Sequence, residues 1–350
     1  MRRGCLSAAG GPANVDYRNL GRTGVKVSEL CLGTMMFGRH TNEQDSVAMI
    51  EHALEQGINF VDTANAYSAG ASERFVGKAL RAGKRAGVVL ATKAFFPQDA
   101  KDPNARGLSR RHLIEACEAS LKRLETDWID LYQLHRAQAD VPIDETLRAL
   151  DDLIRAGKVR YIGTSMFPAW KIVEALWASK EFGLNRFVCE QMAFNLLDRT
   201  AEREVLPAAR SFGIAVIPWA PLCGGLLTGK YKRADQSAAG RWHGGKDNFD
   251  RRVTPEAFDV IEGLEALAAE KRCTPSQLAL AWVGAQPGIT APIIGPRTKE
   301  QLVDNLGAPA VEVTDEDRDR IDKFAPPLHA TLRYYDAAMA VDFRPNLARW

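Results

Sequence analysis

Four polar residues of this chain end or follow short apolar runs that have the length of buried strands. Asp62 ends one run and Tyr67 follows five residues later, Lys93 comes directly after Val88–Thr92, and His135 comes directly after Leu134. The carboxyl ends of the strands in a parallel α/β barrel form one rim, where catalytic residues gather. We therefore expect these four side chains to meet at one site.

An aspartate, a tyrosine, a lysine and a histidine at one site suit the reduction of a carbonyl group. A free tyrosine has a pKa near 10, so it is a weak acid at neutral pH. An adjacent Lys93 ammonium would favour the phenolate and lower the pKa of Tyr67, and Asp62 would keep the lysine charged. His135 would donate a hydrogen bond that orients the carbonyl oxygen. The set predicts that a hydride reaches carbon while Tyr67 protonates oxygen.

Each residue also has a simpler explanation when it is considered alone. A lysine at a strand end is commonly solvated or salt-bridged, and a histidine there commonly makes a structural hydrogen bond. Lys93 would also suit a barrel aldolase or lyase that forms a Schiff base through its amine. Borohydride trapping of a substrate adduct on Lys93 would separate that chemistry from reduction.

Apolar runs alternate with segments of helical period along most of the chain, which predicts a parallel sheet with helical crossovers. A hairpin is expected over 17–28, and no Gly-x-Gly-x-x-Gly motif follows the first run, which weakens a Rossmann interpretation. Eight such units favour a (β/α)8 TIM barrel. Strands are expected at 30–33, 59–62, 88–92, 128–134, 159–165, 187–191, 215–218 and 291–295, and helices at 45–56, 72–80, 109–124, 143–156, 170–182, 201–212, 255–271, 275–286 and 299–307.

The pattern divides the chain into a flexible N-terminal tail (1–14), a barrel (15–325) and a C-terminal extension (326–350). A glycine-rich loop at 230–252 is long enough to be a lid, a binding loop or a disordered segment. The extension contains Tyr334, Tyr335, Phe343 and Trp350. So many aromatic residues predict that it packs near the active site or at a subunit interface.

Composition favours a soluble enzyme. Apolar residues make up 46% of the 350 residues and charged residues 26%, and the net charge is +2, so neither nucleic acid nor a charged membrane is an expected partner. No apolar run is long enough to span a bilayer, and the first residues lack the core of a signal peptide. The six scattered cysteines suit reduced thiols in the cytoplasm, and no motif for a metal site is present.

Several motifs together resemble the aldo-keto reductase family, with greatest similarity to the bacterial branch that is related to potassium-channel β-subunits. The resemblance covers about residues 17 to 325 and implies a nicotinamide cofactor and the tetrad Asp62, Tyr67, Lys93 and His135. The motifs are Asp62-Thr-Ala-Asn-Ala-Tyr67, Ala91-Thr-Lys93, Asp130-Leu-Tyr-Gln-Leu-His135, Gly157-Lys-Val-Arg-Tyr-Ile-Gly-Thr-Ser165, Glu190-Gln191, Pro218-Trp-Ala-Pro-Leu222, Gly225-Leu-Leu-Thr-Gly-Lys-Tyr231 and Ile294-Gly-Pro-Arg-Thr-Lys-Glu-Gln301 to Asn305.

The resemblance also implies where the cofactor binds. Ser165 and Gln191 would hydrogen-bond the carboxamide, Trp219 would stack on the nicotinamide, and residues from Ala220 to Gly225 with Lys230 would follow the pyrophosphate. The adenosine end would lie at the start of the last predicted helix. The full implied set is Thr34, Met35, Asp62, Ser165, Met166, Gln191, Trp219, Ala220, Pro221, Leu222, Gly224, Lys230, Gly295, Arg297, Gln301 and Asn305. Met166 stands where the family usually has asparagine, so one carboxamide hydrogen bond is absent or supplied elsewhere.

These features predict an NADPH-dependent oxidoreductase that acts on an aldehyde or ketone. Arg297 is expected to favour NADPH over NADH by binding its 2′-phosphate. The alternative within the family is a regulatory subunit that holds NADPH with little turnover, although such relatives often carry asparagine in place of His135. The sequence does not identify the individual substrate, because variable loops form its pocket. The direction of conversion and the oligomeric state are also open.

Overall fold

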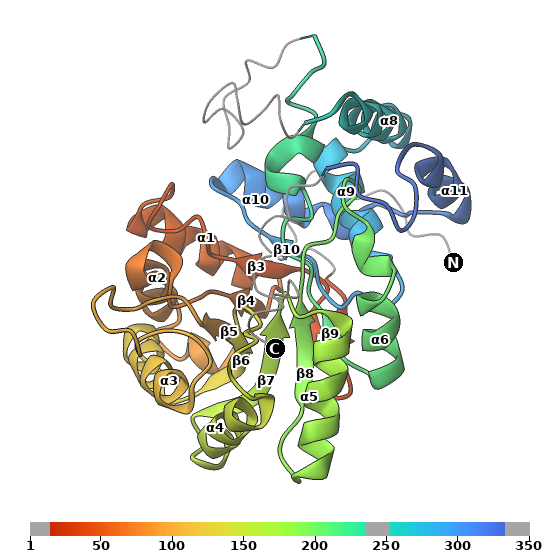
Figure 1. Ribbon diagram of the computed structural model, residues 1–350. Helices are drawn as coiled ribbons and strands as arrows, with labels where there is room; N and C mark the ends of the chain where they lie inside the picture. Colours follow the sequence, from red (N-terminus) through yellow and green to blue (C-terminus); the bar gives the residue numbers. More distant parts are fainter. Residues whose placement is uncertain (1–14, 235–252, 333–350) are drawn as a thin grey trace.

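The computed structural model describes residues 15–234 and 253–332. Its centre is an eight-stranded parallel sheet in the order β10-β3-β4-β5-β6-β7-β8-β9, with helices around it (Figure 1). The two ends of the sheet are joined by a parallel bridge between Val216 and Ile289, where the Thr290 N–H donates to the Val216 oxygen at 2.8 Å. The sheet therefore curls into a barrel, as the alternation of strands and helices predicted.

The strands are short, and the helices that follow them cover their outer faces. The barrel strands are β3 (Cys31–Gly33), β4 (Phe60–Asp62), β5 (Val89–Ala94), β6 (Ile129–Leu134), β7 (Val159–Ser165), β8 (Phe187–Gln191), β9 (Ala215–Val216) and β10 (Ile293–Ile294). The helices are α1 (Glu43–Glu55), α2 (Ala71–Ala79), α3 (Arg110–Leu124), α4 (Ile143–Arg155), α5 (Ala169–Glu181), α6 (Val205–Phe212), α8 (Pro255–Lys271), α9 (Pro275–Gly284), α10 (Lys299–Leu306) and α11 (Asp315–Phe324).

A hairpin of β1 (Tyr17–Asn19) and β2 (Lys26–Ser28) closes the amino-terminal end of the barrel. Leu20 and Val27 of this hairpin are fully buried against the interior side chains of the strands. Gly21 has φ +58°, and a Cβ on it would lie 2.8 Å from the backbone oxygens of Val188 and Gly213. Only glycine tolerates both this backbone conformation and such a close approach to other backbone atoms, so the turn can pack directly against the barrel.

Period-two alternation along the strands builds two interior layers, because every second side chain of a strand points into the barrel. The lower layer is apolar and the layer above it, two residues further along each strand, is polar. The apolar layer contains Phe60, Ala91, Leu131 and Cys189, and the polar layer contains Asp62, Lys93, Gln133 and Gln191. The carboxyl ends of the strands thus hold a buried polar cluster above an apolar floor.

The structure corrects several predicted boundaries. β5 extends to Ala94, so Lys93 lies inside this strand and not after it. Tyr67 begins a short 3-10 segment, η1 (Tyr67–Gly70), where a loop was expected. β9 and β10 are two residues each, shorter than predicted.

Helix α11 was not predicted, although its sequence carries a start signal. Thr314 and Asp317 form a capping box: each side chain accepts a hydrogen bond from the backbone N–H of the other residue. The helix has few buried side chains, Ile321 among them, and this weak apolar pattern concealed it.

Some predictions lie outside the described residues. These are the tail 1–14, residues 235–252 of the long loop and the aromatic residues of the C-terminal extension after 332. The start of the extension pairs with the loop after β8, where the Arg199 N–H donates to the His329 oxygen at 2.8 Å. Among the described residues, no helix is long and apolar enough to cross a membrane.

Candidate active site

Lys93 is the centre of the buried polar cluster. Its Nζ donates to Asp62 Oδ2 at 2.6 Å, to the Thr63 oxygen at 2.8 Å and to Tyr67 Oη at 3.1 Å. An ammonium group has three donors, so these contacts use all of them. Strand pairing explains the geometry, because Asp62 and Lys93 point inward from neighbouring strands while η1 places Tyr67 above both.

Asp62 is held from its other side by two amides. Gln191 Nε2 donates to Asp62 Oδ1 at 2.9 Å, and Gln133 Nε2 donates to the same oxygen at 3.0 Å. Both carboxylate oxygens therefore have partners, as a buried charge requires. Gln133 was not among the predicted site residues. The signal for it was its position two residues after Leu131 and two before His135, on the inward face of β6.

Burial and charge act in opposite directions on the pKa of Lys93. Burial lowers it, but the Asp62 carboxylate and the Tyr67 hydroxyl together raise it above its ordinary value. Lys93 is fully buried and stays an ammonium at neutral pH. This outcome agrees with the expectation that Asp62 keeps the lysine charged.

The pKa of Tyr67 differs from the prediction. Burial raises it, and although the Lys93 charge lowers it, the net direction is upward from the ordinary value near 10. The prediction that Lys93 gives Tyr67 a lowered pKa was therefore wrong for this structure, because it omitted the cost of burying a phenolate. Tyr67 is a protonated phenol at neutral pH, with a cation positioned to stabilise the phenolate that forms when it loses the proton.

His135 directly follows β6, as predicted, and faces Tyr67. The ring centroids of Tyr67 and His135 are 5.7 Å apart, and Phe96 also contacts the imidazole, with a centroid distance of 4.8 Å. Burial and the charges of Lys93 and Arg136 hold the pKa of His135 well below its usual value. The imidazole is therefore neutral at physiological pH and can donate one hydrogen bond.

One cavity of about 390 Å³ connects this cluster to the start of helix α10. Lys93 lies beneath it, and Met166 is the one residue of the implied cofactor set that does not line it. Tyr67 and His135 line the cavity together with Thr34, Met35, Asp62, Ser165, Gln191, Trp219, Ala220, Pro221, Leu222, Gly224, Lys230, Gly295, Arg297, Gln301 and Asn305. The structure thus brings residues from distant parts of the chain to a single space.

The two ends of the cavity differ in chemistry. Near Tyr67 it presents the indole of Trp219 and the Ser165 and Gln191 side chains. At the far end, burial and the nearby charge of Arg297 lower the pKa of Lys230, so two cationic groups lie close together. An aromatic and amide end joined to a cationic end can hold an elongated ligand that carries phosphate groups.

Met166 has a different contact from the one the family pattern implies. Its backbone is in the left-handed region with φ +60°, and its Sδ accepts from Trp219 Nε1 at 3.2 Å. The residue that replaces the usual asparagine therefore touches the indole from outside the cavity.

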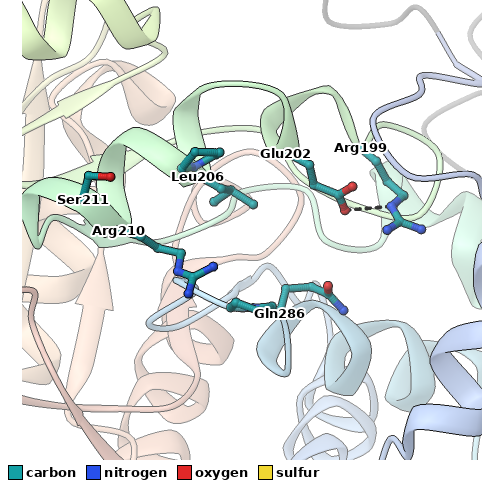
Figure 2. A pocket seen from close by; sticks show the side chains of 8 residues that line it. Arg199, Glu202, Leu206, Arg210, Ser211 and Gln286 are labelled. Carbon is teal, nitrogen blue, oxygen red and sulfur yellow. Dashed lines mark hydrogen bonds and ion pairs between the residues drawn. The ribbon is translucent and has the colours of Figure 1, made fainter.

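A second hollow, of about 620 Å³, is larger and more open (Figure 2). It lies between η3 (Thr200–Glu202), α6 and the loop after α9, and contains none of the predicted site residues. Arg199 in its wall is paired with Glu202 at 2.7 Å and with Asp322 at 2.6 Å. These contacts tie α11 to the barrel.

The described part of the chain has no evident metal-binding site. In residues 15–234 and 253–332, no group of three histidine, cysteine, aspartate or glutamate side chains could hold a metal ion. The five described cysteines are free thiols, four of them buried.

Comparison with known proteins agrees with the fold. Residues 29–326 match the model of the aldo/keto reductase family. An uncharacterized oxidoreductase, YrpG, of Bacillus subtilis is 44% identical over 319 residues, which cover 86% of this chain and 93% of that protein. A probable voltage-gated potassium channel subunit beta of rice is 34% identical over 300 residues, covering 84% and 91% of the two chains.

A further relative carries a reductase name. Versiconal hemiacetal acetate reductase of Aspergillus parasiticus is 34% identical over 327 residues, which cover 87% of this chain and 95% of the relative. The family match spans Asp62, Tyr67, Lys93 and His135. The chain belongs to the aldo/keto reductase family and is an oxidoreductase of carbonyl compounds.

Proposed function

We propose that the protein reduces the carbonyl group of an aldehyde or ketone, with NADPH as the reductant and Tyr67 as the proton donor. The observation that carries this proposal is the position of Lys93 Nζ, which binds Asp62 at 2.6 Å and Tyr67 at 3.1 Å beneath the cavity. A phenol held by a buried ammonium is suited to losing a proton to a developing alkoxide, since the cation stabilises the resulting phenolate.

Tyr67 and His135 have separate parts in this proposal. Because burial raises the pKa of Tyr67, the phenol carries its proton at neutral pH and is ready to donate it. The neutral His135 lies beside it, with ring centroids 5.7 Å apart, and would donate a hydrogen bond that orients the substrate oxygen. The alkoxide would take its proton from Tyr67, and the phenolate would be reprotonated from solvent before the next turnover.

The donor set of the cavity fits NADPH. Ser165, Gln191 and Trp219 would hold the nicotinamide, and Lys230 and Arg297 would hold phosphate groups. When bound, NADPH would supply the hydride that reaches the carbonyl carbon. Gln191 would make one contact through a carboxamide that already donates to Asp62, so it would link the cofactor site to the acid–base cluster.

Arg297 is proposed to give the preference for NADPH. It precedes helix α10, whose amino-terminal Thr298 caps the Gln301 N–H, while the Gln301 side chain accepts from the Arg297 N–H at 2.9 Å. These bonds fix the backbone of Arg297 at the edge of the cavity. A guanidinium held there suits the 2′-phosphate that distinguishes NADPH from NADH.

Turnover of a carbonyl panel tests the proposal. Purified protein is mixed with NADPH and individual aldehydes or ketones, and the loss of NADPH absorbance is followed. Tyr67→Phe should lower kcat by about 10²-fold or more while NADPH still binds. Tyr132→Phe is a matched control, because the Tyr132 hydroxyl is buried on the outer side of β6 and donates to the Leu113 oxygen. Turnover of Tyr67→Phe at the rate of the control would contradict the assignment.

A regulatory subunit that holds NADPH with little turnover is the second candidate. The relatives named as potassium channel β-subunits, from rice and from Arabidopsis thaliana, support it. His135 supports the enzyme instead, because it completes the acid–base set beside Tyr67. Tight NADPH binding without turnover on any carbonyl would favour the regulatory candidate.

The Schiff-base alternative is disfavoured by the state of Lys93. A Schiff base needs a neutral amine that reaches the substrate. Lys93 is fully buried, its pKa is raised, and its three donors are used by Asp62, Thr63 and Tyr67.

A further inference from the structure

Glu190 is a buried titratable residue that the proposed reaction does not use. It is 0% exposed and lies on β8 next to Gln191, but its side chain points outward from the barrel because it alternates with Cys189 and Gln191. Its hydrogen-bond partners in the described part of the chain are neutral. Oε2 accepts from the Thr164 hydroxyl and Oε1 accepts from the Phe167 N–H at 3.2 Å. Burying a carboxyl group without a positively charged partner costs free energy, so its presence here points to a functional role.

The contacts of Glu190 surround a strained turn. Thr164 and Phe167 stand on either side of Ser165 and Met166, where β7 ends. The backbone of Met166 has φ +60°, in the left-handed region that residues other than glycine and asparagine seldom adopt. Its N–H donates to the Gln191 oxygen at 2.9 Å, so β8 holds this turn through both its backbone and the Glu190 side chain.

The same turn controls two groups of the candidate active site. Ser165 points into the cavity, and Met166 Sδ lies 3.2 Å from Nε1 of Trp219, whose indole also lines the cavity. A change in the backbone at Met166 would therefore move both the Ser165 hydroxyl and the support of the indole. Glu190 does not line the cavity, so it can act on a ligand only through these residues.

We propose that Glu190 is a positioning residue, which holds the Thr164–Phe167 turn so that Ser165 and Trp219 are oriented for the nicotinamide end of the cofactor. This inference rests on the proposed function, since it assigns Ser165 and Trp219 to the nicotinamide.

The first test compares two substitutions of Glu190. Glu190→Met removes both acceptors at similar length and should weaken NADPH binding about tenfold, as the loss of one or two hydrogen bonds implies. Glu190→Gln keeps an acceptor for the Phe167 N–H and should bind NADPH within about threefold of wild type. Affinity is measured from the fluorescence of bound NADPH, and Tm is recorded for each variant.

A control separates positioning from stability. Asp151 is also a buried carboxyl that joins two elements, since it accepts from the Asn185 N–H at 3.1 Å, but it lies away from the cavity. Asp151→Leu should lower Tm without changing NADPH affinity. Should Glu190→Met fail to fold, Thr164→Val removes the hydroxyl bonded to Glu190 and should weaken NADPH binding about threefold.

A double-mutant cycle with Ser165→Ala gives the decisive result. If Glu190 acts through Ser165, then Ser165→Ala will weaken NADPH binding in the wild type but far less in Glu190→Met. The loss of NADPH affinity caused by Ser165→Ala should also be smaller when Thr164→Val is already present. If the losses of NADPH affinity from the two substitutions simply multiply in the double variant, the inference is overturned. It is also overturned if Glu190→Met binds NADPH as tightly as wild type. Should Glu190→Met not fold, wild-type affinity in Thr164→Val has the same consequence. If wild type itself neither binds NADPH nor reduces a carbonyl, the proposed function fails instead.

Discussion

Replacing Glu190 by glutamine should make the protein less sensitive to pH between about pH 5 and pH 8. Burial raises the pKa of Glu190 from 4.5 to about 8, although the Thr164 hydroxyl and the N–H groups of Phe167 and Met166 counter part of this effect. A raised pKa means that the folded protein retains a proton that the unfolded chain releases. The stability that this proton contributes is complete below pH 4.5 and is lost as the pH rises toward 8.

The size of the effect follows from the two pKa values. Each pKa unit corresponds to about 1.4 kcal/mol, so the move from 4.5 to about 8 is worth roughly 5 kcal/mol. An unfolding entropy of about 2.1 cal/mol/K per residue gives about 0.7 kcal/mol/K for 350 residues. Between pH 5 and pH 8 about 3.5 kcal/mol of this total is expressed, because the titration is incomplete at both limits, so the difference in Tm between Glu190→Gln and wild type should increase by roughly 5 °C over that range.

Thermal unfolding followed by circular dichroism, at constant ionic strength and at several pH values, measures this difference. Asp151→Asn is the control. Burial raises the pKa of Asp151, but hydrogen bonds from Asn185 and Arg155 outweigh it and lower the pKa below 3.8. That stabilisation is lost only as the pH falls, so the control should differ from wild type by a constant Tm above about pH 5. A constant difference for Glu190→Gln as well would refute the reasoning, because it would mean that Glu190 ionises as it does in water.

Three further predictions concern the candidate site. Asp62→Asn should destabilise the fold by about 3–5 kcal/mol, measured by denaturant unfolding, because Lys93 would stay buried without its carboxylate; an unchanged midpoint would contradict this. Arg297→Ala should weaken NADPH binding about tenfold to a hundredfold and leave NADH binding unchanged, by fluorescence titration; equal losses would exclude the role in discrimination. In the reverse direction, alcohol oxidation should accelerate with rising pH as Tyr67 ionises, because burial raises the pKa of Tyr67; a flat profile of kcat would argue against Tyr67 as the base.

The amino-acid sequence was sufficient to predict the barrel and most residues that line the candidate site. Buried parallel strands leave continuous apolar runs, and Asp62, His135, Ser165 and Gln191 end or follow such runs. These signals are local, because strand pattern and the position of a residue at a strand end can be read within a few residues. The implied cofactor residues then line one cavity, with Met166 as the exception.

What the tertiary structure decided depends on contacts between distant segments. The Tyr67 pKa is raised because the fold excludes water from the phenol, and no local pattern measures that exclusion. Gln133 joins the site because β6 stands between strands that place Asp62 within reach. Glu190 and Met166 gain their contacts only when β7, β8 and Trp219 come together. Sequence determines which groups are present at the rim, and packing determines their charge and their partners.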